Sequence, residues 1–246
     1  MSDRQTVIRL DEVSLCYRLA KQRIGSIKAF AIAWLKGSLT YEALWALKEL
    51  SLTIRAGERV GVVGKNGAGK STLLSVIAGV LKATRGRVIV RGRVAPILEL
   101  GTGFDHELTG VENIYLNALL LGHRRREIDA EVEKIIAFSE LGEFVHSPIR
   151  SYSSGMMARL GFAIATAWIP DILLLDEIFA VGDAGFLRRS EDRLAELKAQ
   201  ATATVLVSHS EEVIRKNCDR CLWLAGGRLV ADGPVEDVLA RYAAEP

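Results

Sequence analysis

Runs of apolar residues along this chain switch between the spacing of strands and the spacing of helices. Residues 7–17 and 50–54 alternate apolar and polar positions, as antiparallel strands with one exposed face do. Two short and nearly continuous apolar runs, 59–63 and 172–175, are typical of strands buried on both faces of a parallel sheet. The spacing is helical from 109 to about 167. The pattern therefore predicts an α/β core that carries a helical insertion.

The remaining elements follow from shorter signals. Residues 222–224 and 229–231 flank Ala225-Gly226-Gly227, which predicts a hairpin, and Pro234 opens a last helix over 235–242. Further strands are expected at 87–90, 94–98 and 204–207.

The segment 24–39 has a pattern of its own. Apolar residues recur there at helical spacing among basic ones, which predicts a short amphipathic helix. Such a helix either packs on the core of this domain or lies at a membrane interface or against a partner, and the residues leave both open. The apolar positions are Ile24, Ile27, Phe30, Trp34 and Leu35.

Composition narrows the class of protein. A chain of 246 residues with 49% hydrophobic and 25% charged residues is expected to bury a core, and a net charge of +2 gives no reason to expect nucleic-acid binding. No apolar stretch reaches the roughly 18 residues that span a membrane. Three cysteines are too few for a disulfide framework, and the lone pair Cys218 and Cys221 is more typical of ordinary thiols in a reducing compartment than of a metal site.

A glycine-rich segment carries the most informative motif. The predicted strand 59–63 precedes it and a predicted helix, 73–78, follows it. Such an arrangement aims backbone N–H groups and a helix dipole at one point, which suits a polyphosphate. We expect Lys70 to reach the β- and γ-phosphates and the Ser71 hydroxyl to hold Mg²⁺. The segment reads Gly64-Lys65-Asn66-Gly67-Ala68-Gly69-Lys70-Ser71-Thr72.

Two carboxylates about a hundred residues after this loop are candidates to act with it. The apolar run 172–175 leads directly into Asp176 and Glu177, which a parallel strand would present at its carboxyl edge. Asp176 suits a Mg²⁺ contact through water, and Glu177 suits a general base for an attacking water. Acids after an apolar strand are common, so the interpretation depends on the phosphate loop that precedes them.

A third segment, Tyr152-Ser153-Ser154-Gly155-Met156, opens a predicted helix. Hydroxyls and a glycine at a helix start bind phosphate oxygens, but the same residues also form an ordinary N-cap. The phosphate loop favours the first interpretation.

The order of these motifs resembles the ATP-binding cassette of ABC transporters over nearly the whole chain. The phosphate loop is followed by Ser153-Ser154-Gly155, by Leu175-Asp176-Glu177 and by Val207-Ser208-His209. The resemblance implies an α/β fold, a P-loop NTPase cassette with a RecA-like core, an antiparallel β subdomain and an inserted helical subdomain. It implies a single nucleotide-binding domain over 1–246, divided into 1–100 with 168–225, 101–167, and 226–246.

The resemblance also implies a head-to-tail dimer, in which the phosphate loop of one copy and the signature helix of the other close on each ATP. Ser153 and Gly155, with Ser154 beside them, would contact the γ-phosphate held by the other copy. His209 would sense the γ-phosphate and position water, and Asp183 would belong to the loop that couples the two sites.

Further segments look like the ATPase subunits of polysaccharide exporters, which serve O-antigen, capsule and teichoic-acid export. Most other cassettes carry Leu-Ser-Gly-Gly-Gln as the signature and a different coupling loop. The matching segments are 99–104, 107–113, 152–156 and 180–186.

Three departures from the common cassette pattern stand out. Glu99 lies near the position where most cassettes carry a Gln, which makes it a candidate for the Mg²⁺ site. The aromatic residue that stacks on adenine is Tyr17 or, given the long insertion, Trp45, and either is also an ordinary packing residue. The chain stops at Pro246 without the carbohydrate-binding domain of some O-antigen exporters, so we expect glycan recognition by the membrane subunit or by other proteins.

We therefore expect an ATP hydrolase with ATP and Mg²⁺ as cofactors. It would work as a homodimer beneath two copies of a membrane permease, peripheral on the cytoplasmic face of the membrane, and drive the export of a lipid-linked glycan. The alternatives are a cassette with another cargo, a non-transport ATPase acting on ribosomes or DNA, and a scaffold that ATP merely switches. The single cassette without a basic face disfavours the second alternative, and Glu177 with His209 disfavours the third.

Overall fold

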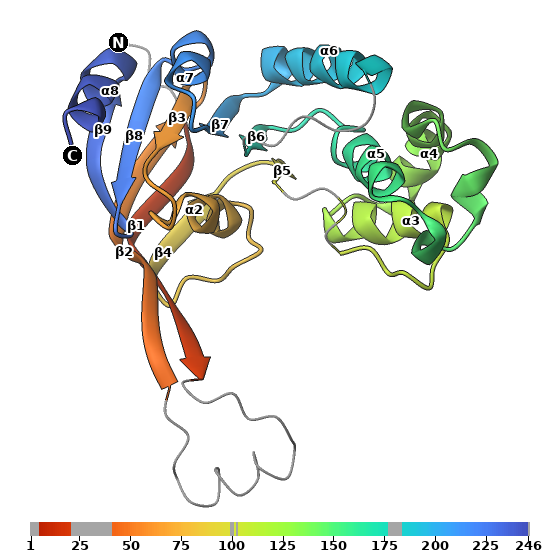
Figure 1. The fold of residues 1–246 in the computed structure, drawn as a ribbon, viewed down its shortest axis with the longest axis horizontal. Helices are drawn as coiled ribbons and strands as arrows, with labels where there is room; N and C mark the ends of the chain where they lie inside the picture. Colours follow the sequence, from red (N-terminus) through yellow and green to blue (C-terminus); the bar gives the residue numbers. More distant parts are fainter. Residues whose placement is uncertain (1–4, 21–40, 99–100, 102, 177–183, 246) are drawn as a thin grey trace, which may run out of the picture.

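The structure, a computed structural model, describes residues 5–20, 41–98, 101, 103–176 and 184–245. Its elements cluster around two sheets, with a group of helices to one side (Figure 1). In chain order they are β1 (Thr6–Ala20), β2 (Tyr41–Arg55), β3 (Arg59–Val63), α2 (Lys70–Ile77), β4 (Arg85–Val90), β5 (Val94–Ile97), α3 (Gly110–Leu120), α4 (Arg125–Ser139), the 3₁₀ turns η1 (Gly142–His146) and η2 (Ile149–Ser151), α5 (Ser154–Ala165), β6 (Ile172–Leu175), α6 (Ala184–Gln200), β7 (Ala203–Val207), α7 (Glu211–Asn217), β8 (Arg220–Ala225), β9 (Arg228–Pro234) and α8 (Val235–Ala243).

The larger sheet has the strand order β5-β6-β7-β3-β8-β9. Its first five strands run parallel, and β9 returns antiparallel to β8 across the predicted hairpin. Every residue of β6 is buried, as its continuous apolar run predicted, and so is every residue of β7. Because β3, β6 and β7 are parallel neighbours, the segments that follow them all emerge at one edge of the sheet.

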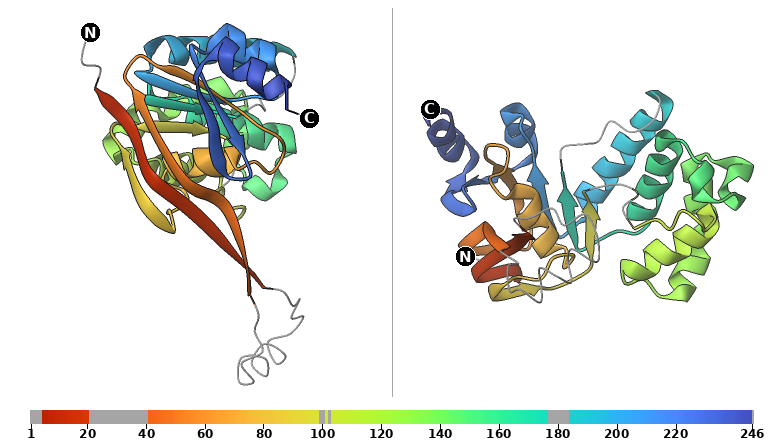
Figure 2. Two further views of the ribbon diagram at one scale, coloured as in Figure 1. Left: turned by 90° about the vertical axis from the view of Figure 1, so that its left-hand side faces the viewer. Right: turned by 60° about the horizontal axis from the view of Figure 1, so that its bottom comes forward.

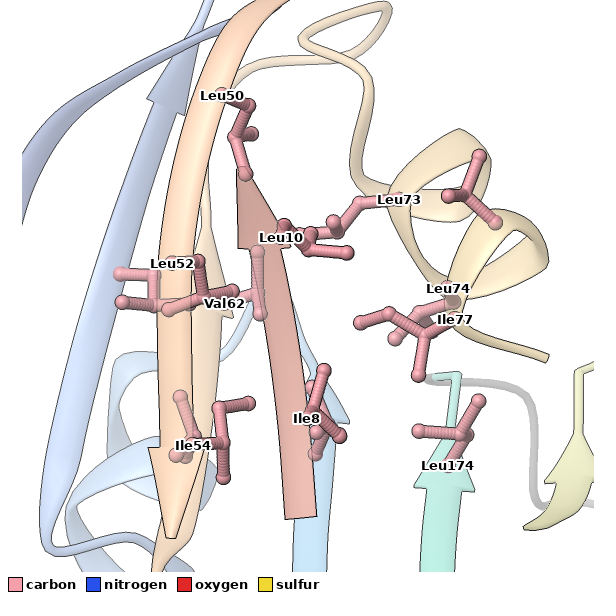
Figure 3. Packing of buried hydrophobic residues seen from close by; sticks show 14 of the residues in the cluster. Ile8, Leu10, Leu50, Leu52, Ile54, Val62, Leu73, Leu74, Ile77 and Leu174 are labelled. Atoms are coloured by element: carbon pink, nitrogen blue, oxygen red, sulfur yellow. The ribbon is translucent and has the colours of Figure 1, made fainter. Parts of the chain in front are cut away.

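One face of this sheet packs against α2 and against a three-stranded antiparallel sheet of order β2-β1-β4. Figure 3 shows Ile8 and Leu10 of β1 between the β2 residues and Leu73, Leu74 and Ile77 of α2. Leu174 of β6 reaches the same core. Alternate residues of each buried strand thus enter this core, and their neighbours enter the core on the opposite face.

The opposite face is covered by α6, α7 and α8. Leu173 and Leu175 of β6 pack there with Phe162 and Phe186, whose rings meet edge to face at 5.9 Å between centroids. The two cores fix β3, β6 and β7 from both sides, so the edge from which the functional loops emerge is rigidly held.

The helical insertion lies to one side of the sheets, where α3, α4 and α5 form their own buried cluster (Figures 1 and 2). His123 stacks on Trp168 with ring centroids 3.8 Å apart, because the turn before α4 folds back onto the end of the insertion.

The first two strands are longer than predicted. Strand β1 extends from Thr6 to Ala20, and β2 begins at Tyr41 rather than near 50. Register shifts in the β1–β2 ladder, one of them between Leu15 and Cys16, break the strict alternation on which strand recognition depends. The predicted amphipathic helix over 24–39 lies outside the described residues and stays a prediction.

Candidate active site

The glycine-rich loop joins the end of β3 to the start of α2, as predicted. Gly69 precedes the helix with φ 104°, and no side chain caps the first turn, so its N–H groups are open to a ligand. A Cβ on Gly64 would lie 2.3 Å from the Leu224 carbonyl oxygen, and one on Gly69 would lie 2.6 Å from that of Ala46. The tight packing of the loop against β2 and β8 therefore requires glycine at both positions.

Lys70 is held inside this loop. Its side chain is only 7% exposed, and its Nζ donates to the carbonyl oxygens of Gly64 at 2.7 Å and Lys65 at 3.2 Å. The ammonium thus lies over the turn at which the N–H groups of α2 are aimed. An anion bound at the helix start would meet a buried positive charge already in position.

Ser71 and Asp176 lie 105 residues apart in the sequence but in contact in the fold. The Ser71 hydroxyl donates to Asp176 Oδ2 at 3.1 Å. Ser71 is exposed and Asp176 is half-buried, so a hydroxyl oxygen and a carboxylate face the outside next to the phosphate loop. Oxygen donors of this kind are those that Mg²⁺ prefers.

The third element of the same edge is the turn after β7. Ser208 is buried, and its hydroxyl accepts the backbone N–H of Ser210 at 3.0 Å, which shapes the turn. His209 between them is exposed. The structure thus places His209 on the edge of the sheet that also carries the phosphate loop and Asp176.

Three predicted site residues, Glu99, Glu177 and Asp183, lie outside the described residues. Their roles stay predictions.

The serines of the signature segment lie elsewhere. Ser153 caps α5 by accepting the backbone N–H of Met156 at 3.2 Å, and both Ser153 and Ser154 are exposed. A Cβ on Gly155 would meet the Ser153 Oγ at 3.8 Å, an ordinary van der Waals contact. Figure 1 and the right view of Figure 2 both show α5 well away from α2, with β5 and β6 between them. One chain therefore does not bring these residues to its own phosphate loop.

The two candidate aromatics lie side by side on β1 and β2 but in different surroundings. Trp45 is half-buried beneath the Arg85 guanidinium, which lies 5.2 Å from the ring centroid. Tyr17 is 36% exposed and pairs with Leu44 across the ladder, whereas Trp45 pairs with Cys16. Because opposed residues share a face and successive residues alternate, Tyr17 and Trp45 point to opposite faces of the sheet.

The β8–β9 hairpin supports the loop in a way that the sequence did not predict. The Gly227 backbone N–H donates to the Ala68 carbonyl at 3.1 Å, and a pocket of about 320 Å³ between loop and hairpin includes Trp223 and Glu245. The Gly-Gly pair signalled a turn but carried no information about where that turn packs.

Comparison with known proteins agrees with this geometry. The family model described as ABC transporter matches residues 47–180, more than half of the chain. The chain belongs to the ABC transporter family. Its predicted fold and its assignment as a transport-coupled ATP hydrolase are thereby confirmed.

Similar proteins include export ATPases. The chain is 49% identical over 197 residues to the O-antigen export system ATP-binding protein RfbB of Klebsiella pneumoniae, with 80% of each chain covered. It is 43% identical to the protein of that name from Myxococcus xanthus, covering 88% of this chain and 50% of that one. It is 39% identical to the teichoic acids export ATP-binding protein TagH of Enterococcus faecalis, covering 98% of this chain and 53% of that one.

Solved structures share the fold at lower identity. The ATP-binding subunit of an ABC transporter superposes with a TM-score of 0.69 at 22% identity, covering 96% of this chain and 93% of that one. A dimeric cassette in a post-hydrolysis state with ADP and Pi gives 0.66 at 22% identity, covering 93% and 98%. Among the described residues, the helices are too short or too polar to cross a bilayer.

Proposed function

We propose that this cassette hydrolyses ATP to drive export of a lipid-linked polysaccharide, of the O-antigen, capsule or teichoic-acid type, through a separate membrane permease. The observation that carries the proposal is the 49% identity to an O-antigen export ATPase over 80% of both chains. The 39% identity to a teichoic acids export ATPase extends the likeness to 98% of this chain.

The separation of α5 from α2 supports a head-to-tail dimer. Ser153, Ser154 and Gly155 are exposed or half-exposed at the start of a helix, yet the phosphate loop of the same chain lies beyond β5 and β6 (Figures 1 and 2). A second copy would bring this helix start to the γ-phosphate of an ATP held by Lys70. Asp183 would then lie in the loop between the two sites.

The residues at the sheet edge divide the chemistry of hydrolysis among them. Lys70 binds the β- and γ-phosphates and offsets their charge. Glu177, the residue after Asp176, accepts a proton from the attacking water, and His209 orients that water toward the γ-phosphate. Lys70 follows the carboxyl end of β3, and His209 follows that of β7.

Ser71 and Asp176 fit a divalent cation. Their oxygens lie 3.1 Å apart beside the phosphate loop, and together with Glu99 they form the oxygen donor set that we propose for Mg²⁺. When bound, Mg²⁺ would neutralise charge on the phosphate oxygens during transfer.

Tyr17 is the better candidate for stacking on adenine. Tyr17 is 36% exposed and therefore open to a ligand, whereas Trp45 is half-buried beneath the Arg85 guanidinium.

A groove lies beside Gly101, Gly103 and Phe104. It has a volume of about 360 Å³ and includes Pro96, Phe104 and Leu121, between the end of β5 and α3. Leu120 and Val80 border it with exposed fractions of 70% and 71%. Apolar side chains this exposed mark an interaction surface. We propose that this groove holds a cytoplasmic segment of the permease. Such a contact would place the cassette peripherally on the cytoplasmic face of the membrane.

Replacing Glu177 by Gln in the source cell tests the proposed function. We expect ATP binding to persist, ATP turnover to fall by roughly 10²–10⁴-fold, and lipid-linked polymer to accumulate inside while surface polysaccharide disappears. The matched control is Glu191→Gln, the same chemical change at an exposed position of α6, which is expected to leave surface glycan unchanged. Normal surface glycans in a Glu177→Gln strain without ATPase activity would refute polysaccharide as the cargo and leave another exported molecule.

A further inference from the structure

A small pocket lies at the edge of the large sheet opposite the phosphate loop. It has a volume of about 240 Å³ and is lined by the C-terminal parts of α6 and α7, by Arg59 at the start of β3, and by Thr204 and Leu206 of β7. Arg59 begins β3 and pairs with Thr204 of β7, whereas the phosphate loop follows the other end of β3. A five-residue strand is about 16 Å long, so this pocket is distinct from the ATP site.

Three cations from three different elements line this pocket, namely Arg59 of β3, Lys198 of α6 and Lys216 of α7. Within the described part of the chain, none of them forms an ion pair with a carboxylate. Lys198 donates to the amide oxygen of Asn217 at 3.2 Å. The acids nearest to these cations in the sequence are engaged elsewhere or exposed: Glu58 pairs with Arg220, Glu196 pairs with Arg193, and Asp219 is exposed and donates its backbone N–H to the Arg59 carbonyl oxygen. The three cations that line the pocket thus meet there without a carboxylate paired to any of them.

The pKa of Lys198 is lowered, chiefly by burial. The neighbouring Cys218 thiol opposes this shift, and the like charges of Arg59 and Lys216 add to it. A cation in such surroundings is stabilised by an anion that enters the pocket.

The helix dipoles neutralise only part of the positive charge at the pocket. Helix α6 ends at Gln200 and α7 ends at Asn217, and each C-terminus carries about half a negative charge. The two ends together therefore offset about one of the three positive charges. An excess of roughly two positive charges is left at a pocket in which Lys198 is half-buried and Arg59 and Lys216 are exposed.

We propose that this pocket binds a free, compact phosphate oxyanion of the size of orthophosphate or pyrophosphate. Its volume of about 240 Å³ lies below the roughly 300–1,000 Å³ typical of pockets for larger organic ligands, which disfavours a nucleotide. Two flexible ammonium groups and a planar guanidinium match an anion with several oxygens in different directions. Orthophosphate is also a product of the reaction of an ATP hydrolase, so the ligand is present where the cassette works.

Occupancy would connect two helices that follow predicted site residues in the sequence. Helix α6 begins directly after residues 177–183, and α7 begins two residues after His209. Figure 1 shows α6 leading into β7 on the same side of the molecule as α7. An anion held by Lys198 and Lys216 would bridge the far ends of these two helices.

Titration calorimetry with pyrophosphate tests the proposal on the full chain. All variants carry Lys70→Ala, which weakens competing binding at the phosphate loop. We expect Lys198→Met to weaken pyrophosphate binding by roughly tenfold or more, since it removes one charge-assisted contact and keeps the length of the side chain. The control, Lys134→Met on α4, removes the same charge far from the pocket and is expected to change the affinity by less than about twofold.

Two further measurements distinguish loss of the binding site from loss of folding. Lys216→Met should reproduce the loss if Lys198→Met melts earlier than its parent. In the unmodified chain, pyrophosphate should shift the amide NMR signals of Thr204 and Asn217 as well as those of the phosphate loop. The proposal is overturned if pyrophosphate does not bind to the Lys70→Ala chain, if all the lysine variants bind it equally, or if Lys134→Met loses as much affinity as Lys198→Met.

Discussion

Replacing Lys70 by Met tests whether ATP affinity depends on the position of the Lys70 charge or only on the net positive charge of the phosphate loop. The Lys70 ammonium is buried and bonded to the carbonyls of Gly64 and Lys65, so in the empty protein it already lies where phosphate would bind. A hydrogen bond to a charged group contributes about 1.5–3 kcal/mol, which corresponds to a loss of roughly 10- to 150-fold in ATP affinity.

The same change has two effects on the stability of the protein, and they oppose each other. Losing the bond to the Gly64 carbonyl, which accepts from Lys70 at 2.7 Å, costs about 1–3 kcal/mol, because that carbonyl lies in a buried part of the loop. Removing a buried ammonium offsets part of this cost. We therefore expect the melting temperature to fall by no more than about 10 °C and the variant to be folded at 25 °C.

The matched control lies in the same loop. Lys65 is exposed, and Lys65→Met removes an equal charge five residues earlier. Calorimetry with a non-hydrolysable ATP analogue should show a few-fold loss for Lys65→Met and the full loss for Lys70→Met. Equal losses would mean that ATP senses only the net charge of the loop, and the argument from the position of Lys70 would be wrong.

The remaining predictions concern backbone packing and the thiols. Gly64→Ala should destabilise the protein by roughly 2–6 kcal/mol in urea denaturation, because its Cβ would lie 2.3 Å from the Leu224 carbonyl oxygen at φ +151°; an unchanged midpoint would contradict the close packing. Burial raises the pKa of Cys218 and of Cys221 from 9.0 to about 12, so a thiol reagent at pH 8 should label Cys16 alone in the native chain and three thiols after denaturation. The contribution of these raised pKa values to the free energy of unfolding is fully present below about pH 9. It should be lost as the pH rises toward 12, because the thiols of the unfolded chain lose their protons at lower pH than those of the folded chain. A double Cys218→Ala and Cys221→Ala variant should show a shallower fall, and an equal slope would rule out the thiols as its cause.

Strand boundaries show where sequence reasoning failed. The alternation rule found residues 7–17 of β1 but missed the first half of β2, because the ladder changes register between Leu15 and Cys16. The same shift decides which face Tyr17 and Trp45 occupy. Their order along the chain left that choice open, since it depends on how two distant strands pair.

The sequence by itself determined the elements whose cause is local. A glycine turn between a buried strand and a helix specifies a phosphate loop, and continuous apolar runs specify strands that are covered on both faces. Only the tertiary structure decided the contact of Ser71 with Asp176, which lie 105 residues apart, and the convergence of Arg59, Lys198 and Lys216 on one pocket. The physical reason is that parallel strands bring together side chains that are far apart in the chain, and which of them meet depends on strand order and helix packing, which leave no mark in local spacing.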